Sequence, residues 1–457
     1  MAGKSGILKS IATVAVALTI IAQTSAQSYT SYFMHDAVER KDHNAAFAPD
    51  RGYFNIPIVG GFSVSSSGSL SLGQILYPDG SGYSVFVDPS ISANSALSPL
   101  NDINTFGTDN TVTILGFGQY CKDRSSFWSF DLNVRSLVNF SAPYELFEFV
   151  KLAPDQIQIS DVELYTDNYV EAAFGYSKVV NDKLTVGARV KFLGGLANGR
   201  FLIDEMTLTS EDGEWTSSNV VGGLDMYAPG LTVSNTPFGF EDIEIDDSAI
   251  SGFSGYGAGI DLGATYNYSD RLQLSLAVND LGFIAWNKDS NVRAMLSNNF
   301  IIYSIVYGDE VVYDTSESAD LCYEDILFDK QSSQSSTKWL QANMNAGAEY
   351  ALVEDMLNVG AIYSLDLWHT MTVHNFTPVV SFNPTDWFTL AASYTVASYG
   401  ANAFGLALNV ATNFVNLYLA TDILTAKKDG ELFVPLNQSM ANVSFGLAIP
   451  MGKRGER

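Results

Sequence analysis

The chain has 457 residues, of which 47% are hydrophobic and 16% charged, and its formal net charge is −26. A chain this acidic lacks the Lys/Arg patches that nucleic acids and anionic lipids require. We therefore expect no nucleic-acid partner. Its two cysteines, Cys121 and Cys322, are too few for a disulfide framework.

Residues 1–26 predict a secretory signal peptide. Lys4 and Lys9 are followed by an apolar run from Ile11 to Ala22 and by small residues ending at Ala26. A basic start, a short apolar stretch and a small-residue cleavage site are the marks of such a peptide. A membrane anchor is the alternative, but no stop-transfer pattern follows. We expect the mature chain to begin near Gln27.

From residue 53 to residue 450 the chain consists of paired segments that alternate apolar and polar residues. In residues 272–279, Leu or Val occupies every second position. A period of two with one apolar face is the pattern of a half-buried strand. Placed behind a secretory signal, it predicts an all-β protein, a transmembrane antiparallel β-barrel of about fourteen strands. The predicted strands are Tyr53–Ser65, Thr111–Cys121, Ser125–Asn139, Tyr169–Val180, Lys183–Ile203, Ser254–Tyr268, Leu272–Trp286, Trp339–Leu352, Met356–Trp368, Thr372–Phe382, Trp387–Ser398, Ala403–Ala411, Phe414–Asp422 and Ala441–Pro450.

The connections between these segments sort by length. Every even-numbered strand before the last is followed by a short turn, such as Asn181-Asp182 or Thr412-Asn413, whereas the long connections all follow odd-numbered strands. Short periplasmic turns and long outer loops are the known asymmetry of outer-membrane barrels. This topology puts Cys121 and Cys322 at opposite ends, so we expect no disulfide between them. Residues 451–457 are left as a periplasmic tail.

The same alternation assigns the two faces of the wall. Apolar sets such as Val170 to Tyr176 and Leu184 to Phe192 are expected to face lipid, where an Arg or Lys at the midplane costs about 2–4 kcal/mol. Polar and charged residues of both signs are expected to face the lumen: Asp131, Arg135, Glu171, Arg189, Lys191, Asp261, Gln273, Glu349 and Asp366.

Two other segments interrupt the strand pattern. Tyr144–Lys151 predicts a short amphipathic helix over the outer rim. Residues 201–250 are rich in Asp and Glu and contain no Lys or Arg, which favours a long, solvated outer loop, and no calcium-binding motif is present. Within it, residues 204–227 resemble a hairpin, interpreted as an extension, although its inclusion in the wall would make sixteen strands.

No catalytic or metal-binding pattern stands out. The four histidines are His35, His43, His369 and His374, and neither Gly-Xaa-Ser-Xaa-Gly nor His-Glu-Xaa-Xaa-His occurs. Asp261, between Gly259 and Gly263, is better interpreted as a carboxylate paired with a lumen cation than as a functional acid. We predict no enzyme activity, catalytic residue, metal or cofactor.

The stretch after the signal carries a family resemblance. Ser31-Tyr32-Phe33-Met34, Asn44-Ala45-Ala46-Phe47-Ala48-Pro49 and Arg51-Gly52-Tyr53-Phe54-Asn55-Ile56-Pro57 resemble the start of a Bacteroidota outer-membrane family of unknown function. More distantly, the strand count and the motifs at 259–263 and 279–282 look like the long-chain fatty-acid transporter (FadL-like) superfamily and PorV-like barrels. Those families have an Asn-Pro-Ala hatch in the lumen. Here Ala45 replaces the proline.

The resemblance implies that residues 27–52 form a plug, with His35, Arg40 and Asn44 as plug candidates. The alternative for this segment is a disordered exported tail. The implied function is a FadL-like conduit in the bacterial outer membrane for a small hydrophobic or amphipathic molecule. The alternatives are a PorV-like barrel that binds protein partners through its outer loops and a secreted β-sandwich adhesin.

Overall fold

The computed structural model describes residues 29–57, 60–78, 83–86, 88, 90–211, 214–236, 239–245, 252–296, 301–303, 328–398, 402–422 and 440–452. The expected signal peptide at 1–26 lies outside these residues, as does Cys322. Cys121 is an exposed free thiol next to the turn that follows the second wall strand.

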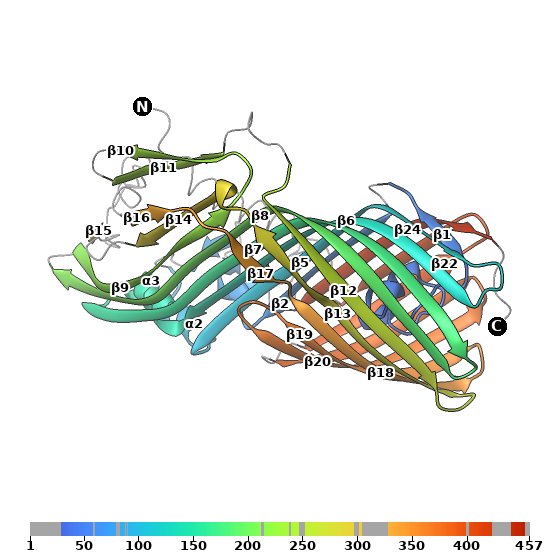
Figure 1. Ribbon diagram of the computed structural model, residues 1–457. Coiled ribbons are helices and arrows are strands. Elements are labelled where there is room, and N and C mark those ends of the chain that lie inside the picture. Colours follow the sequence, from blue (N-terminus) through green and yellow to red (C-terminus); the bar gives the residue numbers. More distant parts are fainter. Residues whose placement is uncertain are drawn as a thin grey trace.

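The described strands form one closed antiparallel barrel (Figure 1). Its wall consists of β1 (Gly52–Asn55), β2 (Gly61–Gly68), β5 (Ile103–Tyr120), β6 (Ser126–Pro143), β7 (Gln156–Asn181), β8 (Leu184–Glu211), β12 (Gly255–Asn267), β13 (Leu272–Trp286), β17 (Ser336–Trp339), β18 (Ala342–Val353), β19 (Leu357–Leu367), β20 (Thr372–Thr385), β21 (Phe388–Ala397), β22 (Asn402–Ala411), β23 (Asn416–Thr421) and β24 (Ala441–Met451). Closure comes from β1 and β2, each of which pairs with β24 on one side and β5 on the other.

The predicted strand count is confirmed. In the described part of the chain, β1 with β2 and β17 with β18 each occupy one position in the wall, which makes a 14-stranded barrel. The first wall strand is interrupted between Asn55, which lies opposite Ala448, and Gly61, which lies opposite Gly446. Alternating side chains and short polar turns are local signals, and they were sufficient to place every strand of the wall.

Three strands are much longer than the sequence predicted. β5 begins at Ile103 rather than Thr111, β7 begins at Gln156 rather than Tyr169, and β8 continues to Glu211. The additional residues pair with one another, as Gln156 does with Thr209, so much of the expected loop at 140–168 is strand. These strands project beyond the wall as a sheet, to the left in Figure 1.

The predicted hairpin extension lies on this projecting sheet. β9 (Glu214–Tyr227) pairs with β8 on one side and with β14 (Asn291–Leu296) and β15 (Ile301–Tyr303) on the other. The wall closes without it, through the pairing of β8 with β12, so the sixteen-strand alternative is wrong. The other described strands are β3 (Leu76–Pro78), β4 (Tyr83–Val85), β10 (Leu231–Thr236), β11 (Gly239–Ile245) and β16 (Phe328–Ser332).

Helices are few and short. α3 (Tyr144–Leu152) matches the predicted helix and packs its apolar residues against the projecting sheet, where Ile157, Ile159 and Trp215 are buried. α2 (Ala93–Leu97) begins after Ser92, whose side chain caps it by accepting from the Ser95 N–H. Among the described residues, no helix is long and apolar enough to cross a membrane.

The two faces of the wall follow the predicted phase. The large outward side chains are apolar and exposed, for example Phe174 at 52%, Phe192 at 59% and Leu276 at 57%. Their inward neighbours are buried and polar, among them Glu171, Lys191 and Ser275. Trp339 and Phe414 add exposed aromatic rings near strand ends. The barrel thus has an apolar exterior and a charged interior, the reverse of a soluble protein.

Candidate functional site in the barrel lumen

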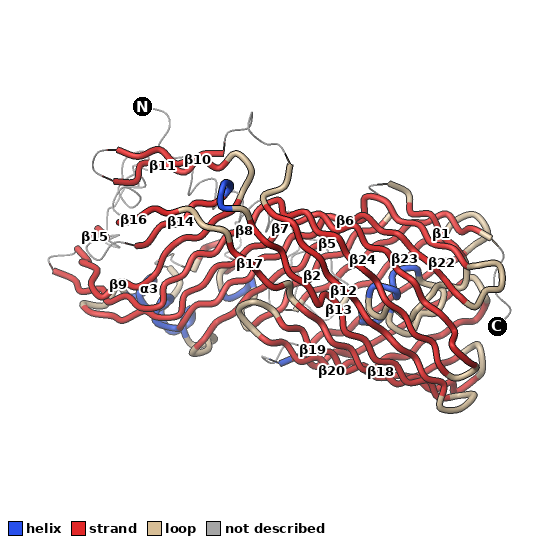
Figure 2. Tube along the Cα trace, in the orientation of Figure 1, coloured by secondary structure: helices blue, strands red, loops and turns tan. Residues whose placement is uncertain are grey.

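A segment at the start of the described chain lies inside the barrel. We call Tyr29–Asp50 the inner segment. It contains two short 3₁₀ helices, Tyr29–Ser31 and Val38–Asp42 (Figure 2). Tyr32, Phe33 and Met34 are buried against inward residues of the wall such as Ile362 and Tyr418. The inner segment is therefore packed in the lumen rather than extended as a tail.

Glycines in the wall make room for it. A Cβ at Gly187 would overlap the carbonyl of Ala45, and one at Gly263, directly opposite on the next strand, would overlap the Asn44 side chain. The same holds for Gly347, Gly360, Gly405 and Gly446, which meet Tyr32, Phe33, Thr30 and Glu39 in turn. Glycine inside a strand often marks the close approach of another backbone. These inward glycines were a signal in the sequence for the position of the inner segment, and the prediction from the sequence did not use them.

Asn44 ties the inner segment to the wall. Its side chain is fully buried, and its Nδ2 donates to the carbonyl of Leu276 at 3.2 Å and that of Ala264 at 3.5 Å. Its Oδ1 accepts from the Ala46 N–H at 2.9 Å. A buried amide whose donors and acceptor are all used holds one position, because leaving any of them unmet costs about 1–3 kcal/mol.

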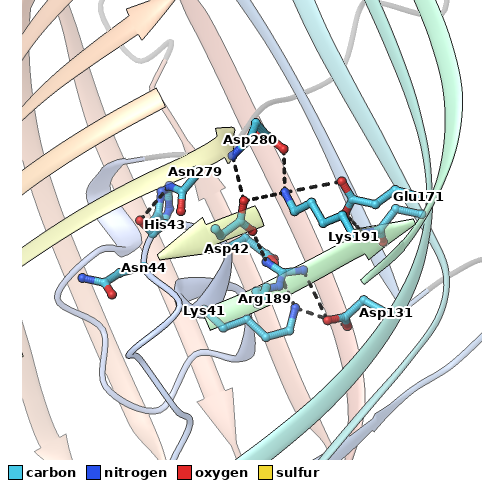
Figure 3. Close-up of polar contacts among 12 residues, drawn as sticks. Lys41, Asp42, His43, Asn44, Asp131, Glu171, Arg189, Lys191, Asn279 and Asp280 are labelled. Atoms are coloured by element: carbon cyan, nitrogen blue, oxygen red, sulfur yellow. Dashed lines mark hydrogen bonds and ion pairs between the residues drawn. The ribbon is translucent and has the colours of Figure 1, made fainter. Parts of the chain in front are cut away.

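The inner segment also joins an ion-pair network with the wall (Figure 3). Arg189 of β8 donates to Asp42 at 2.7 Å and lies 3.5 Å from Asp131 of β6. Lys41 lies 3.1 Å from Asp42 and 3.3 Å from Asp131. Two cations and two carboxylates, one of each from the inner segment, therefore form one set, and Arg189 also lies 3.8 Å from Asp261 of β12. Because the set is buried, removal of any one member would leave a buried charge uncompensated.

A second set lies beside it on the wall. Lys191 Nζ lies 2.9 Å from Asp261 and 2.5 Å from Asp280, and Glu171 is 3.4 Å away. Asp280 also accepts from Arg135 at 2.8 Å. Asp280 was absent from the predicted lumen residues. A β-bulge sets residues 279 and 280 against Asp261 alone, so both side chains are buried instead of alternating.

The remaining predicted residues occupy separate places. Glu349 pairs with His35 at 3.0 Å. Asp366 accepts from the Tyr29 hydroxyl at 3.1 Å. Arg40 is buried, with its guanidinium 4.0 Å from the centre of the Phe47 ring. Gln273 lies apart from the network, near the strand end, where it donates to Asn267.

A cavity of about 150 Å³ lies between the inner segment and the wall. Hydroxyl, amide and charged side chains dominate its lining, among them Ser63, Thr111, Asn133, Arg135 and Asp366. Within the described residues, no group of three or more His, Cys, Asp or Glu side chains could hold a metal ion. The arrangement is suited to binding a small polar group by hydrogen bonds and charge.

Several solved structures are similar to this chain at low sequence identity. A "TodX deltaS2S3 mutant monoaromatic hydrocarbon channel" is 13% identical, with a TM-score of 0.42, covering 95% of this chain and 96% of that one. The Pseudomonas putida toluene transporter TodX is 11% identical with a TM-score of 0.41, covering 91% and 95%. A Pseudomonas aeruginosa FadL homologue is 11% identical with a TM-score of 0.37, covering 93% of each chain.

No curated protein matches the sequence. The model of a family of unknown function, DUF5723, matches residues 45–422. This match confirms the predicted resemblance to a family of unknown function and covers most of the barrel. The chain therefore belongs to the DUF5723 family.

Proposed function

We propose that this protein is an outer-membrane barrel that conducts a small amphipathic molecule, with the inner segment, Tyr29–Asp50, as its plug. The observation that carries the proposal is the polar cavity between the inner segment and the wall. The side chains that line this cavity come from two parts of the chain, the inner segment and the wall. Displacement of one part would connect the cavity to both ends of the barrel.

The membrane location rests on the outer face of the wall. Phe174, Phe192 and Leu276 are each more than half exposed, and they come from three different strands. A continuous apolar band on a closed barrel has its favourable environment in lipid, and closure leaves no strand edge unpaired there. The bacterial outer membrane is where such single-chain barrels reside.

The plug role rests on how the inner segment is held. Its contacts with the wall combine ion pairs through Lys41 and Asp42, hydrogen bonds of the Asn44 amide and close approaches at wall glycines. Apart from the peptide chain, which continues through Arg51 into β1, none of the contacts named here is covalent or part of a strand ladder. A segment held this way can leave the lumen without breaking the barrel, whose own strand pairs are complete.

The cavity favours an amphipathic molecule over a pure hydrocarbon. An apolar cavity of about 150 Å³ stays dry and binds benzene, whereas this one is lined by Asp109, Asn133, Arg135 and similar groups. A ligand without polar atoms would leave acceptors such as Asn133 Oδ1, which has no partner among the described residues, unsatisfied at about 1–3 kcal/mol each.

Single-channel conductance in planar lipid bilayers tests the proposal. Gly187→Ala and Gly263→Ala each place a methyl group against the inner segment, so both variants should show frequent, large openings that the wild type lacks. Gly259→Ala is the matched control, because its Cβ meets only ordinary contacts, at 3.5 Å or more. Variants that fold and remain closed would contradict the conduit.

A second candidate is a barrel that binds a protein partner. It is favoured by the projecting sheet of β7, β8 and β9, which extends well beyond the wall and is braced by α3. Two results together would support this alternative. The lumen would stay closed in both glycine variants, and one outer-membrane protein would co-purify with the wild type but not with a variant whose projecting sheet is altered.

A further inference from the structure

The side chains that line the cavity next to the inner segment include more acidic than basic groups. Among its lining residues are six carboxylates but only four Lys or Arg side chains. All four cations already form ion pairs: Lys41 and Arg189 with Asp42, and Arg135 and Lys191 with Asp280. Positive charge in the cavity is thus already neutralised, while negative charge is in excess.

Two carboxylates in this lining, Glu39 of the inner segment and Asp366 of the wall, have no cation within ion-pair distance among the described residues. Asp366 accepts hydrogen bonds from Tyr29, Asn343 and Asn375, and no Lys, Arg or His of the described chain lies within ion-pair distance of it. Its partners are all neutral donors. Three neutral donors leave about one of its four lone-pair sites free, so the carboxylate retains its attraction for a cation.

Three buried amides supply an independent observation. Asn133, Asn279 and Asn375 line the cavity and are 6%, 5% and 2% exposed. In each, the Oδ1 atom is buried and accepts no hydrogen bond from the described residues. Buried polar atoms normally have partners, so these three acceptors need donors, which either water or a ligand in the cavity would supply.

The orientation of each amide is set by its neighbours. The NH₂ of Asn133 donates to Glu171 at 3.1 Å, and that of Asn375 donates to Asp366 at 2.8 Å. The NH₂ of Asn279 donates to the His43 carbonyl at 3.0 Å. Because all of these partners are acceptors, rotation of the amide would set oxygen against oxygen. The atoms left over are therefore acceptors, not donors.

We infer that the cavity binds a small organic cation with hydrogen-bond donors, a primary amine in its ammonium form, with Asp366 as its counter-charge. This assignment rests on the proposed conduit and names the class of molecule that it conducts. An ammonium group has three donors and no acceptor, which complements the free acceptors of the lining. At about 150 Å³ the cavity holds a ligand about as large as benzene.

Isothermal titration calorimetry on the purified full-length protein in detergent tests the inference with three four-carbon probes: butylammonium, 1-butanol and butyrate. Their sizes are similar and their charges differ. We expect butylammonium to bind at least about tenfold more tightly than 1-butanol, and butyrate not to bind. Equal binding of all three probes, or preference for butyrate, would overturn the inference without any variant.

Asp366→Asn should weaken butylammonium binding about tenfold, because the charge is lost and the shape is kept. Asp225→Asn is the matched control: it also removes one negative charge, but Asp225 lies on β9 and pairs with Lys338 outside the cavity lining. An unchanged affinity in Asp366→Asn, or an equal loss in Asp225→Asn, would contradict the site. Binding can be measured without conduction, so these results are separate from those of the glycine variants. If butylammonium binds but both glycine variants stay closed, only the proposed conduit is rejected. If the variants open but the protein shows no preference for butylammonium, only this inference is rejected.

Discussion

The carboxylate of Asp261 accepts a hydrogen bond at 2.7 Å from the backbone N–H of Asp280, across the bulge between β12 and β13. Asp280 has a φ of 60°, a conformation that Asp adopts more readily than most residues. The two acids are thereby brought together on Lys191, which contacts both. Lys191 thus reduces the repulsion between two buried carboxylates, and Arg135 supplies a second cation to Asp280 at 2.8 Å.

Replacement of Lys191 should therefore be costly. Lys191→Met should lower the free energy of unfolding by about 3–5 kcal/mol, because it leaves buried carboxylates uncompensated. The measurement is the urea midpoint of the refolded barrel in detergent. Lys178→Met is the control: Lys178 is exposed near the other end of the same hairpin and should change stability by less than about 0.5 kcal/mol. Equal effects would mean that the network contributes nothing beyond surface charge.

Neighbouring residues on β13 should differ sharply in their tolerance of arginine. Leu274 is exposed on the apolar outer face, so Leu274→Arg should cost up to about 2–4 kcal/mol in lipid. Gln273→Arg points to the other face and should be nearly neutral. Refolding into lipid vesicles, followed by the heat-dependent shift in gel mobility, measures both. Equal tolerance would mean that the outer face does not meet lipid.

Acidity should favour the plugged state. Burial raises the pKa of Glu39 from 4.5 to about 7, and its Oε2 has no hydrogen-bond partner among the described residues. Burial also acts to raise the pKa of Asp42, but Lys41 and Arg189 outweigh it and lower that pKa to about 2, so Asp42 stays ionised. When the inner segment is docked in the lumen, Glu39 therefore binds a proton more tightly than a free Glu does. This proton stabilises the docked state fully below the ordinary pKa of Glu, and the stabilisation is lost as pH rises through about 7.

Open probability in bilayers should accordingly increase between about pH 5 and pH 8. Glu39→Gln removes the titrating group, keeps the shape and should leave openings rare across this range. The groups that face Glu39 are Lys41 and Asp42 of the inner segment and Tyr418 of the wall. A pH response that persists in Glu39→Gln would assign it to another group.

Cys121 should report the orientation of the barrel. It is exposed beside the short β5–β6 turn, at the end of the barrel that the proposed topology places in the periplasm. A membrane-impermeant maleimide should therefore label it in lysed cells and spare it in intact cells. Cys322→Ser provides the single-cysteine background for this measurement. Labelling of Cys121 on intact cells would reverse the assigned orientation.

The sequence by itself determined the wall of this protein. Strand positions and faces follow from side chains that alternate every residue, and strand ends follow from turn residues such as Asn181 and Asp182. Both are local properties of the chain. The segregation of charge, with Glu171 and Lys191 inward and Phe174 and Phe192 outward, follows from the same period.

Only the tertiary structure decided what the lumen contains. The bulge that directs Asp280 inward depends on pairing between two strands, and the pairing of Arg189 with Asp42 joins residues 147 positions apart. The projecting sheet arises because β7 and β8 continue to pair after the wall has ended. Such contacts depend on which segments meet in space, which alternation along one strand does not encode. The path of the inner segment past Gly187 and Gly263 is decided in the same way, by the closed barrel around it.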